Sequence, residues 1–176
     1  FRAFYKDNKS ECFTPGFILV LHTFGRDLKW NPHIHCLVSE GGIGNSGLWR
    51  SKTHFNYTFL RNAFRTALLD LMEKEIGTSF KSVKNRCYKE HKYGFYVYAK
   101  PNKCNPKIVT KYIGRYLGRP VIATSRIDRY DGETVTFHYN RHEDNRLITE
   151  SVPVMEFIQR LIQHIPEKHF KQIRYY

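Results

Sequence analysis

The 176-residue sequence predicts an α+β fold, with a central antiparallel sheet and helices mainly on one face. Two observations predict this class: short β-rich runs are joined by connections of hairpin length, and segments with helical spacing of apolar residues lie between them. Neither an internal repeat nor a low-complexity linker divides the chain. We therefore expect residues 1–176 to form a single domain. Because the chain begins with Phe1 and ends on Tyr176 without a change in composition, we expect this domain to be excised from a longer protein.

The first half of the chain predicts two strands, a turn and a helix. Residues 17–25 (FILVLHTFG) and 33–39 (HIHCLVS) are strands, and the short segment between them predicts an antiparallel hairpin that turns near Asp27 and Leu28. The glycine-rich stretch 40–47 predicts a turn. Residues 56–76 have apolar side chains at helical spacing and are followed by Gly77, which is typical of a helix end.

The second half predicts two further helices and several strands. Residues 105–118 predict a helix, because Asn105 suits the N-cap and Pro106 the first helical position. Asp131 and Gly132 are the strongest hairpin signal in the chain. The other expected elements are strands at 93–100, 121–130, 133–140 and 169–175, and an amphipathic helix from Ser151 to about His164.

The net charge of +13, from 29 Lys and Arg against 16 Asp and Glu, predicts a polyanionic partner. The basic residues do not line one amphipathic helix, and no apolar run approaches the roughly 20 residues of a membrane span, so nucleic acid is favoured over a membrane. The four cysteines form no C-x-x-C pair, which argues against a zinc knuckle or a redox dithiol. They are typical of a cytoplasmic protein with reduced thiols.

A pair of histidines is the first candidate site. His33 and His35 are two apart in a predicted strand, so both imidazoles lie on one face and could hold one metal ion. On the opposite face we expect Ile34, Cys36 and Val38 to enter the core. His22, in the preceding strand, is the candidate third ligand, with Asp27 in reserve. The alternative is that these are surface histidines, or strand histidines bonded to backbone groups.

A pair of tyrosines is the second candidate site. Tyr112 and Tyr116 are four apart on the predicted 105–118 helix, so they project from one face about one turn apart. Lys111, Arg115 and Arg119 form a basic stripe beside them, which would lower a phenol pKa and hold a phosphate. The alternative is that both tyrosines are packing residues of an amphipathic helix.

Together, the HIH strand and the later tyrosine pair on a basic helix resemble the HUH endonucleases, and most closely the two-tyrosine rolling-circle transposases of insertion sequences. The similar stretches, in family order, are LHTFGRDLKWNPHIHCLVSEGG (21–42), VYAKP (97–101), KYIGRYLGRPV (111–121) and HIPEKHFKQIRYY (164–176). The Cys-rich segment that usually precedes this domain, and the region that usually follows it, are not part of this sequence.

The resemblance implies an HUH nuclease fold, of the ferredoxin or RRM-like type, and a bacterial transposase that nicks and rejoins single-stranded DNA through a 5′-phosphotyrosine. It implies that Tyr112 and Tyr116 are the nucleophiles and that His33, His35 and His22 hold magnesium or manganese. The implied partners are transposon ends and target DNA, and the implied location is the cytoplasm, at the nucleoid during action. Candidate DNA contacts are Lys100, Lys111, Arg115, Arg119 and Arg126, each of which could also be a solvated charge. Trp30 and Tyr98 are candidates for base stacking, and Tyr98 is equally compatible with the core.

Two other readings stay open. A plasmid replication initiator or a conjugative relaxase would share the chemistry, although the paired tyrosines argue against a single-tyrosine initiator, and relaxases often carry their tyrosines ahead of the histidines. A non-catalytic nucleic-acid-binding domain would bind DNA without forming a covalent link. The sequence does not determine the oligomeric state, the DNA sequence recognised or the order in which the tyrosines act.

Overall fold

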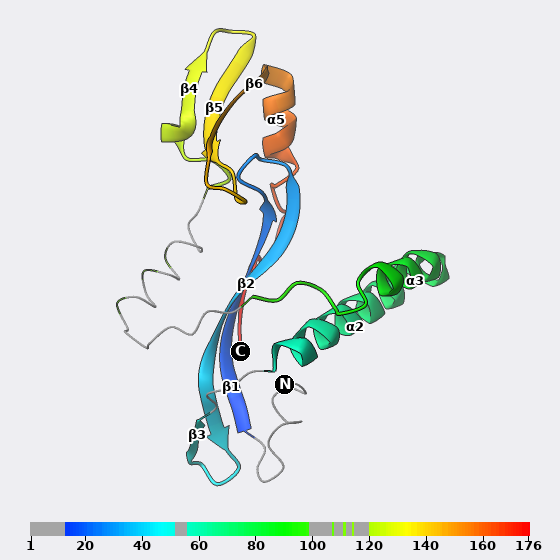
Figure 1. Cartoon of the computed structure of the whole chain (residues 1–176). Coiled ribbons are helices and arrows are strands. Elements are labelled where there is room, and N and C mark those ends of the chain that lie inside the picture. The colour runs from blue at the N-terminus through cyan, green and yellow to red at the C-terminus, as the bar shows by residue number, and fades with distance from the viewer. Residues whose placement is uncertain (1–12, 52–55, 99–106, 108–110, 112–113, 115–119) are drawn as a thin grey trace. The chain divides into compact units, whose positions relative to one another are not determined.

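The computed structural model describes residues 13–51, 56–98, 107, 111, 114 and 120–176. The strands of this part of the chain form two antiparallel sheets, one in the order β3-β2-β1-β7 and one in the order β4-β5-β6 (Figure 1). The helices α2, α3 and α5 accompany them. This confirms the α+β class with antiparallel strands, and it divides the expected sheet into two.

The chain separates into two compact units, each made of two segments. The first comprises Phe1–Gly16 and Ser39–Lys103, and the second comprises Phe17–Val38 and Cys104–Tyr176. Strands β1 (Phe13–Phe24) and β2 (Trp30–Gly44) contribute residues to both units.

The hairpin predicted between β1 and β2 is confirmed. The Leu28 N–H donates to the Gly25 carbonyl at 3.2 Å, and the Gly25 N–H donates to the Lys29 carbonyl at 2.9 Å, which closes the turn. Both strands are longer than predicted, and β2 continues into the stretch 40–47 that predicts a turn.

The glycines in that stretch allow the backbones of neighbouring strands in the first unit to come close together. A Cβ on Gly42 would lie 2.1 Å from the Thr14 carbonyl oxygen of β1, and a Cβ on Gly41 would lie 2.2 Å from that of Arg50. Arg50 belongs to β3 (Trp49–Ser51), a strand that the sequence pattern does not predict. The turn therefore follows Gly44, whose N–H donates to the Leu48 carbonyl at 2.9 Å.

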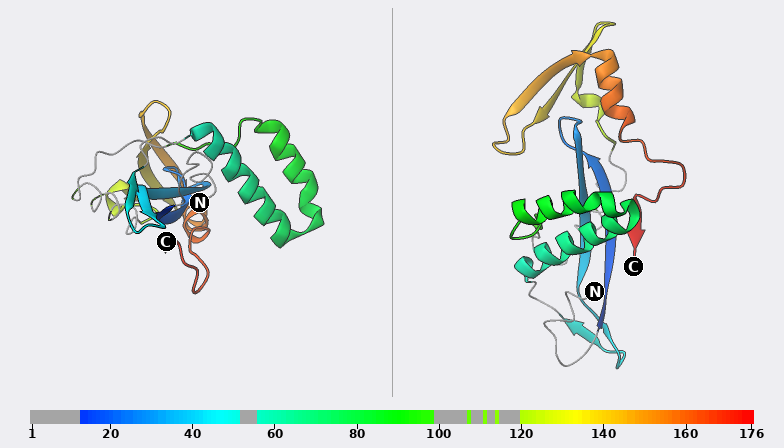
Figure 2. Two further views of the ribbon diagram at one scale, coloured as in Figure 1. Left: turned by 90° about the horizontal axis from the view of Figure 1, so that it is seen from below. Right: turned by 90° about the vertical axis from the view of Figure 1, so that its right-hand side faces the viewer.

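In the first unit, α2 (Tyr57–Ile76) is the predicted helix, and Asn56 caps it by accepting the Phe59 N–H at 2.9 Å. After a 3₁₀ turn at Thr78–Phe80, α3 (Lys81–Glu90) returns beside α2 (Figure 2). Sequence spacing does not predict α3, because it is mostly polar and buries none of its residues. It is joined to α2 by Lys84, whose ammonium lies 2.6 Å from carboxylate oxygens of both Asp70 and Glu73.

The strand predicted at 93–100 is wrong for residues 93–98, which form no strand. The Phe95 N–H donates instead to the Arg61 carbonyl of α2, at 3.2 Å. Aromatic and β-branched residues indicate a strand from sequence alone, but here they lie along a helix.

In the second unit, β4 (Ile127–Tyr130), β5 (Thr134–Asn140) and β6 (Leu147–Pro153) form a meander, and α5 (Val154–Ile162) follows β6 directly (Figure 1). The buried core consists of Leu28, Val135, Phe137, Val152 and Phe157. The β4–β5 hairpin at Asp131 and Gly132 is confirmed. Strand β7 (Ile173–Tyr175) pairs with β1 and occupies three of the residues predicted as a final strand.

Three predicted boundaries in this unit are wrong. Residues 121–126 are not strand, because Thr124–Arg126 is a 3₁₀ turn. Ser151–Pro153 is the end of β6, so the last helix begins at Val154 rather than Ser151, and it ends at Ile162 rather than near His164. Of the predicted 105–118 helix, Lys107, Lys111 and Gly114 are described, and all three are helical.

Candidate metal centre

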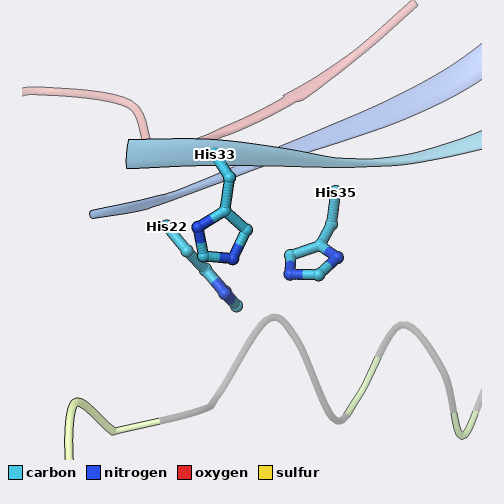
Figure 3. Close-up of side chains that lie close together, drawn as sticks. All are labelled: His22, His33 and His35. Atoms are coloured by element: carbon cyan, nitrogen blue, oxygen red, sulfur yellow. The ribbon is translucent and has the colours of Figure 1, made fainter. Parts of the chain in front are cut away.

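Three histidines from the two strands of the β1–β2 hairpin converge on one point (Figure 3). His22 of β1 and His33 and His35 of β2 each offer a ring nitrogen, and these nitrogens all lie within 4.8 Å of one another. Ring centroids are 4.8 Å apart for His22 and His35, and 4.9 Å apart for His33 and His35. The structure therefore brings the predicted pair and the predicted third ligand together.

The tautomer of His33 suits metal binding. Its Nδ1 lies 2.7 Å from the backbone carbonyl of Asn31, which can only accept a hydrogen bond. Nδ1 must therefore carry the proton, and the lone pair of a neutral His33 is on Nε2. A carbonyl acceptor on the far nitrogen is the arrangement that orients metal-ligating histidines and raises their basicity.

The three histidines differ in how much of their surface is exposed. His22 is buried, with 6% of its surface exposed, whereas His33 and His35 are half-buried. The prediction that Ile34 and Cys36 enter the core is wrong, because both are exposed; Val38 is half-buried. At residues 33–36 of β2, the strand face that carries the histidines is therefore more covered than the opposite face.

The β1–β2 turn beside the histidines is anchored in the core of the second unit. Leu28 has no exposed surface and packs with Phe137 and Phe157. It adopts a left-handed backbone with φ 65°, which is rare for a residue with a side chain and is tolerated where the surroundings fix it. Because Leu28 terminates the turn, its burial fixes where β2 starts relative to β1.

Hydrogen bonds from outside the hairpin hold the same turn. His164 is buried, and its Nε2–H donates to the Leu28 carbonyl at 2.9 Å while its Nδ1 accepts from the Thr23 hydroxyl at 3.0 Å. The Arg160 guanidinium donates to the Asp27 carbonyl at 3.2 Å, and the Arg126 guanidinium donates to the Arg26 carbonyl at 2.5 Å. The residues that position the candidate site are therefore distant in sequence from the histidines.

The donor set fits a divalent cation. Two nitrogens bound at about 2.1 Å to one ion, at right angles, are about 3 Å apart, so small rotations of the imidazoles would close the cluster. Among the described residues, the cluster supplies three imidazole ligands to such an ion. Asp27, the reserve ligand, lies in the turn and outside this cluster, where its carboxylate accepts the Lys29 N–H at 3.3 Å.

The other predicted site residues have mixed outcomes. Tyr112, Tyr116, Lys100, Arg115 and Arg119 lie outside the described residues. Lys111 is helical and exposed.

Arg126 has a structural role, since its guanidinium also donates to the His138 carbonyl at 2.9 Å. Trp30 is 57% exposed and stacks on His164, with ring planes 3° apart. Tyr98 is 72% exposed, which argues against its being a core residue. DNA contact by any of these side chains stays a prediction.

Sequence patterns did not identify Leu28 or His164 as residues that position the site. For Leu28 the available signal is a single apolar residue in an otherwise polar turn, between Asp27 and Lys29. His164 lies just beyond the last turn of α5, and no local pattern relates it to the hairpin. Both are explained only by contacts between distant segments.

Residues 16–176 match a protein family described as "Putative transposase". The transposase for insertion sequence element IS801 of Pseudomonas savastanoi pv. phaseolicola is 30% identical over 174 residues, which cover 92% of this chain and 42% of that protein. A protein of Sinorhizobium fredii named "Putative transposase y4qJ" is 30% identical over 180 residues, covering 92% of this chain and 45% of its own length. The chain spans less than half the length of these two relatives. No solved structure matches it significantly.

Proposed function

The chain belongs to this family of transposases, and from that premise we propose that it cuts and rejoins single-stranded DNA with Tyr112 and Tyr116 as nucleophiles. The observation that carries the proposal is the cluster of His22, His33 and His35. Within the described residues, no helix has the length and apolar character needed to cross a membrane. The charge of +13 favours DNA as the partner.

The three histidines would hold a divalent cation through ring nitrogens. When bound, such an ion supplies Lewis-acid polarisation of a phosphate oxygen and orients the phosphorus for in-line attack. Imidazoles alone favour transition metals, but a site that water and phosphate oxygens complete can accept magnesium or manganese. The Asn31 carbonyl keeps the His33 ring in the orientation and tautomer that binding needs.

Each tyrosine would act through its phenolic oxygen. A bond forms between that oxygen and the scissile phosphorus, the bond from phosphorus to the 3′ oxygen breaks, and the 3′ oxygen leaves with a proton as a hydroxyl. The product is a 5′-phosphotyrosine. Its phosphodiester retains the energy of the broken link, so a 3′-hydroxyl can attack it and reseal a strand without ATP.

On the predicted 105–118 helix the two tyrosines would be neighbours on one face, which would give each of them a separate cleavage to perform. Residues four apart on a helix are neighbours on one face. One tyrosine can therefore remain linked to a first strand while the other cleaves a second, either the target or the other transposon end. Lys111, which is exposed, and Arg115 each precede one of the two tyrosines in the sequence. They would neutralise phosphates of the DNA strand that the tyrosines cut.

The proposal is tested by the covalent adduct. The protein is mixed with manganese and labelled single-stranded oligonucleotides from the ends of its insertion sequence, and the mixture is denatured and separated by size. We expect an adduct that EDTA prevents, that a duplex of the same sequence does not give, and that Tyr112→Phe combined with Tyr116→Phe abolishes. His33→Ala combined with His35→Ala should abolish it as well.

Two matched variants serve as controls. Tyr130→Phe alters an exposed tyrosine of β4, and His142→Ala alters an exposed histidine after β5, so neither should reduce the adduct. Adduct formation that survives the double tyrosine substitution would refute the assignment of the nucleophiles. Binding to the oligonucleotide without any adduct, indifferent to EDTA, would identify a non-catalytic DNA-binding domain instead.

A further inference from the structure

Three tyrosines on the segment that follows α3 are far more exposed than aromatic side chains usually are. Tyr93, Tyr96 and Tyr98 have 82%, 79% and 72% of their surface exposed. Scattered single exposed apolar residues need no explanation, but three aromatic rings within six residues do. We call these three residues the tyrosine platform. All of them belong to the first unit.

Tyr96 and Tyr98 point outward because the residues that alternate with them, Phe95 and Val97, contact α2. From Phe95 to Tyr98, successive residues alternate between half-buried and exposed, as in an extended backbone with one side covered. The Phe95 N–H donates to the Arg61 carbonyl at 3.2 Å, and the Phe95 ring packs edge-on against Phe64 at 6.2 Å. The Arg61 guanidinium donates back to the Val97 carbonyl at 3.5 Å.

Gly94 permits this docking. It has φ 88°, and a Cβ there would lie 2.3 Å from the Arg61 carbonyl carbon and 2.6 Å from the Asn62 nitrogen. Only glycine allows the segment to approach the helix backbone so closely. The tyrosines are therefore held on a fixed support and are not the side chains of an unattached loop.

Cations accompany the platform. The Arg61 guanidinium carbon lies 5.9 Å from the centre of the Tyr96 ring, and Lys89 and Lys92 are exposed nearby in sequence. The carboxylates of Asp70 and Glu73 are engaged by Lys84. Within the part of the chain that the structure describes, no ion pair joins a carboxylate to Arg61, Lys89 or Lys92.

We propose that the tyrosine platform binds unpaired bases of single-stranded DNA by stacking, with Arg61, Lys89 and Lys92 neutralising the adjacent phosphates. Aromatic rings beside basic residues are the combination that binds single strands without regard to sequence, because every base has a π-face. Paired bases, which are stacked on one another, cannot reach such rings. This inference rests on the proposed function, which supplies the single strand as substrate.

The platform is separate in chemistry from the candidate metal centre. Stacking needs no metal ion and forms no bond, so it persists in EDTA, where the covalent reaction does not occur. The two proposals can therefore fail independently. A protein that forms no adduct can still be assayed for platform binding, and a platform that binds nothing leaves the adduct assay intact.

The test is the affinity of the whole chain for a fluorescein-labelled oligothymidylate in EDTA, measured by fluorescence anisotropy. Each of Tyr93→Ala, Tyr96→Ala and Tyr98→Ala should weaken binding by about 5- to 150-fold, from the usual size of a base–aromatic stack. The corresponding phenylalanine variants keep the ring and should bind within about twofold of the unaltered protein. Tyr130→Ala, which removes an exposed ring of β4, is the matched control and should have no effect.

Because the three rings are exposed, their removal should leave the thermal unfolding midpoint unchanged, and this is measured on each variant. Unchanged affinity in the triple alanine variant would overturn the proposal. Equal losses in the alanine and phenylalanine variants would overturn stacking. A protein that is dimeric until the tyrosines are removed, with oligonucleotide affinity unaffected, would show that the platform binds a second copy of the chain.

Discussion

Leu28→Ala tests whether the β1–β2 turn is anchored by its one apolar side chain. Leu28 has no exposed surface and belongs to the core cluster with Val135 and Phe137. The substitution removes three buried carbons, worth about 2.4 kcal/mol at 0.8 kcal/mol each, and leaves a cavity between β5 and α5. Measured losses for such changes are about 2–5 kcal/mol. We expect the free energy of unfolding to fall by about 3 kcal/mol. The left-handed backbone does not contribute to this change, because it is as unfavourable for alanine as for leucine.

The assay is denaturant unfolding followed by circular dichroism. The matched control is Leu147→Ala, because Leu147 lies on β6 of the same unit and is 61% exposed; its loss should stay within about 0.5 kcal/mol. In native buffer, Leu28→Ala should also weaken manganese binding, since the turn fixes β1 against β2 and so His22 against His33. If both leucine variants unfold at the same denaturant concentration, the turn is not anchored as described.

Two further perturbations follow from the packing. Gly94→Ala should destabilise the protein by about 1–3 kcal/mol, because the new Cβ would meet the Arg61 backbone and because φ is positive. The control is Gly132→Ala, which has φ 98° but nothing within 4 Å of the new Cβ, and which should destabilise the protein by only about 1 kcal/mol. Equal thermal unfolding midpoints of the two variants would contradict this. Hydrogen bonds from the Thr134 backbone and hydroxyl, and then from the Glu133 N–H, lower the pKa of Asp131 from 3.8 to about 2. A lowered folded-state pKa stabilises the protein above pH 4, and this contribution disappears as the pH falls towards 2. Unfolding midpoints between pH 5 and 2 should fall more steeply for the unaltered protein than for Asp131→Asn, and parallel curves would be the contrary result.

The candidate metal centre was predictable because its determinants are local. The alternation of a strand places His33 and His35 on one face, and a hairpin of known turn length places His22 beside them. The structure confirms both inferences. The sequence could not predict that Ile34 and Cys36 would be exposed, because which face of a strand is covered depends on segments far away in the chain.

The parts of the fold that sequence patterns missed depend on tertiary contacts. Gly41 and Gly42 are typical of a turn in sequence, yet they are strand residues at which the backbones of neighbouring strands come close. Helix α3 buries none of its residues and is joined to α2 through polar contacts, among them the ion pairs of Lys84 with Asp70 and Glu73. The aromatic residues after α3 have the composition of a strand, but Gly94 lets them dock on a helix.

The most direct test of the candidate metal centre is the number of imidazole nitrogens bound to the cation. Pulsed electron paramagnetic resonance of the manganese-loaded protein detects nitrogen-14 coupling from each ligating ring. We expect coupling from three imidazoles, reduced by one in His22→Ala, in His33→Ala and in His35→Ala, and unchanged in His142→Ala. Manganese bound without nitrogen coupling, or with coupling that persists when all three histidines are replaced, would contradict metal binding by His22, His33 and His35.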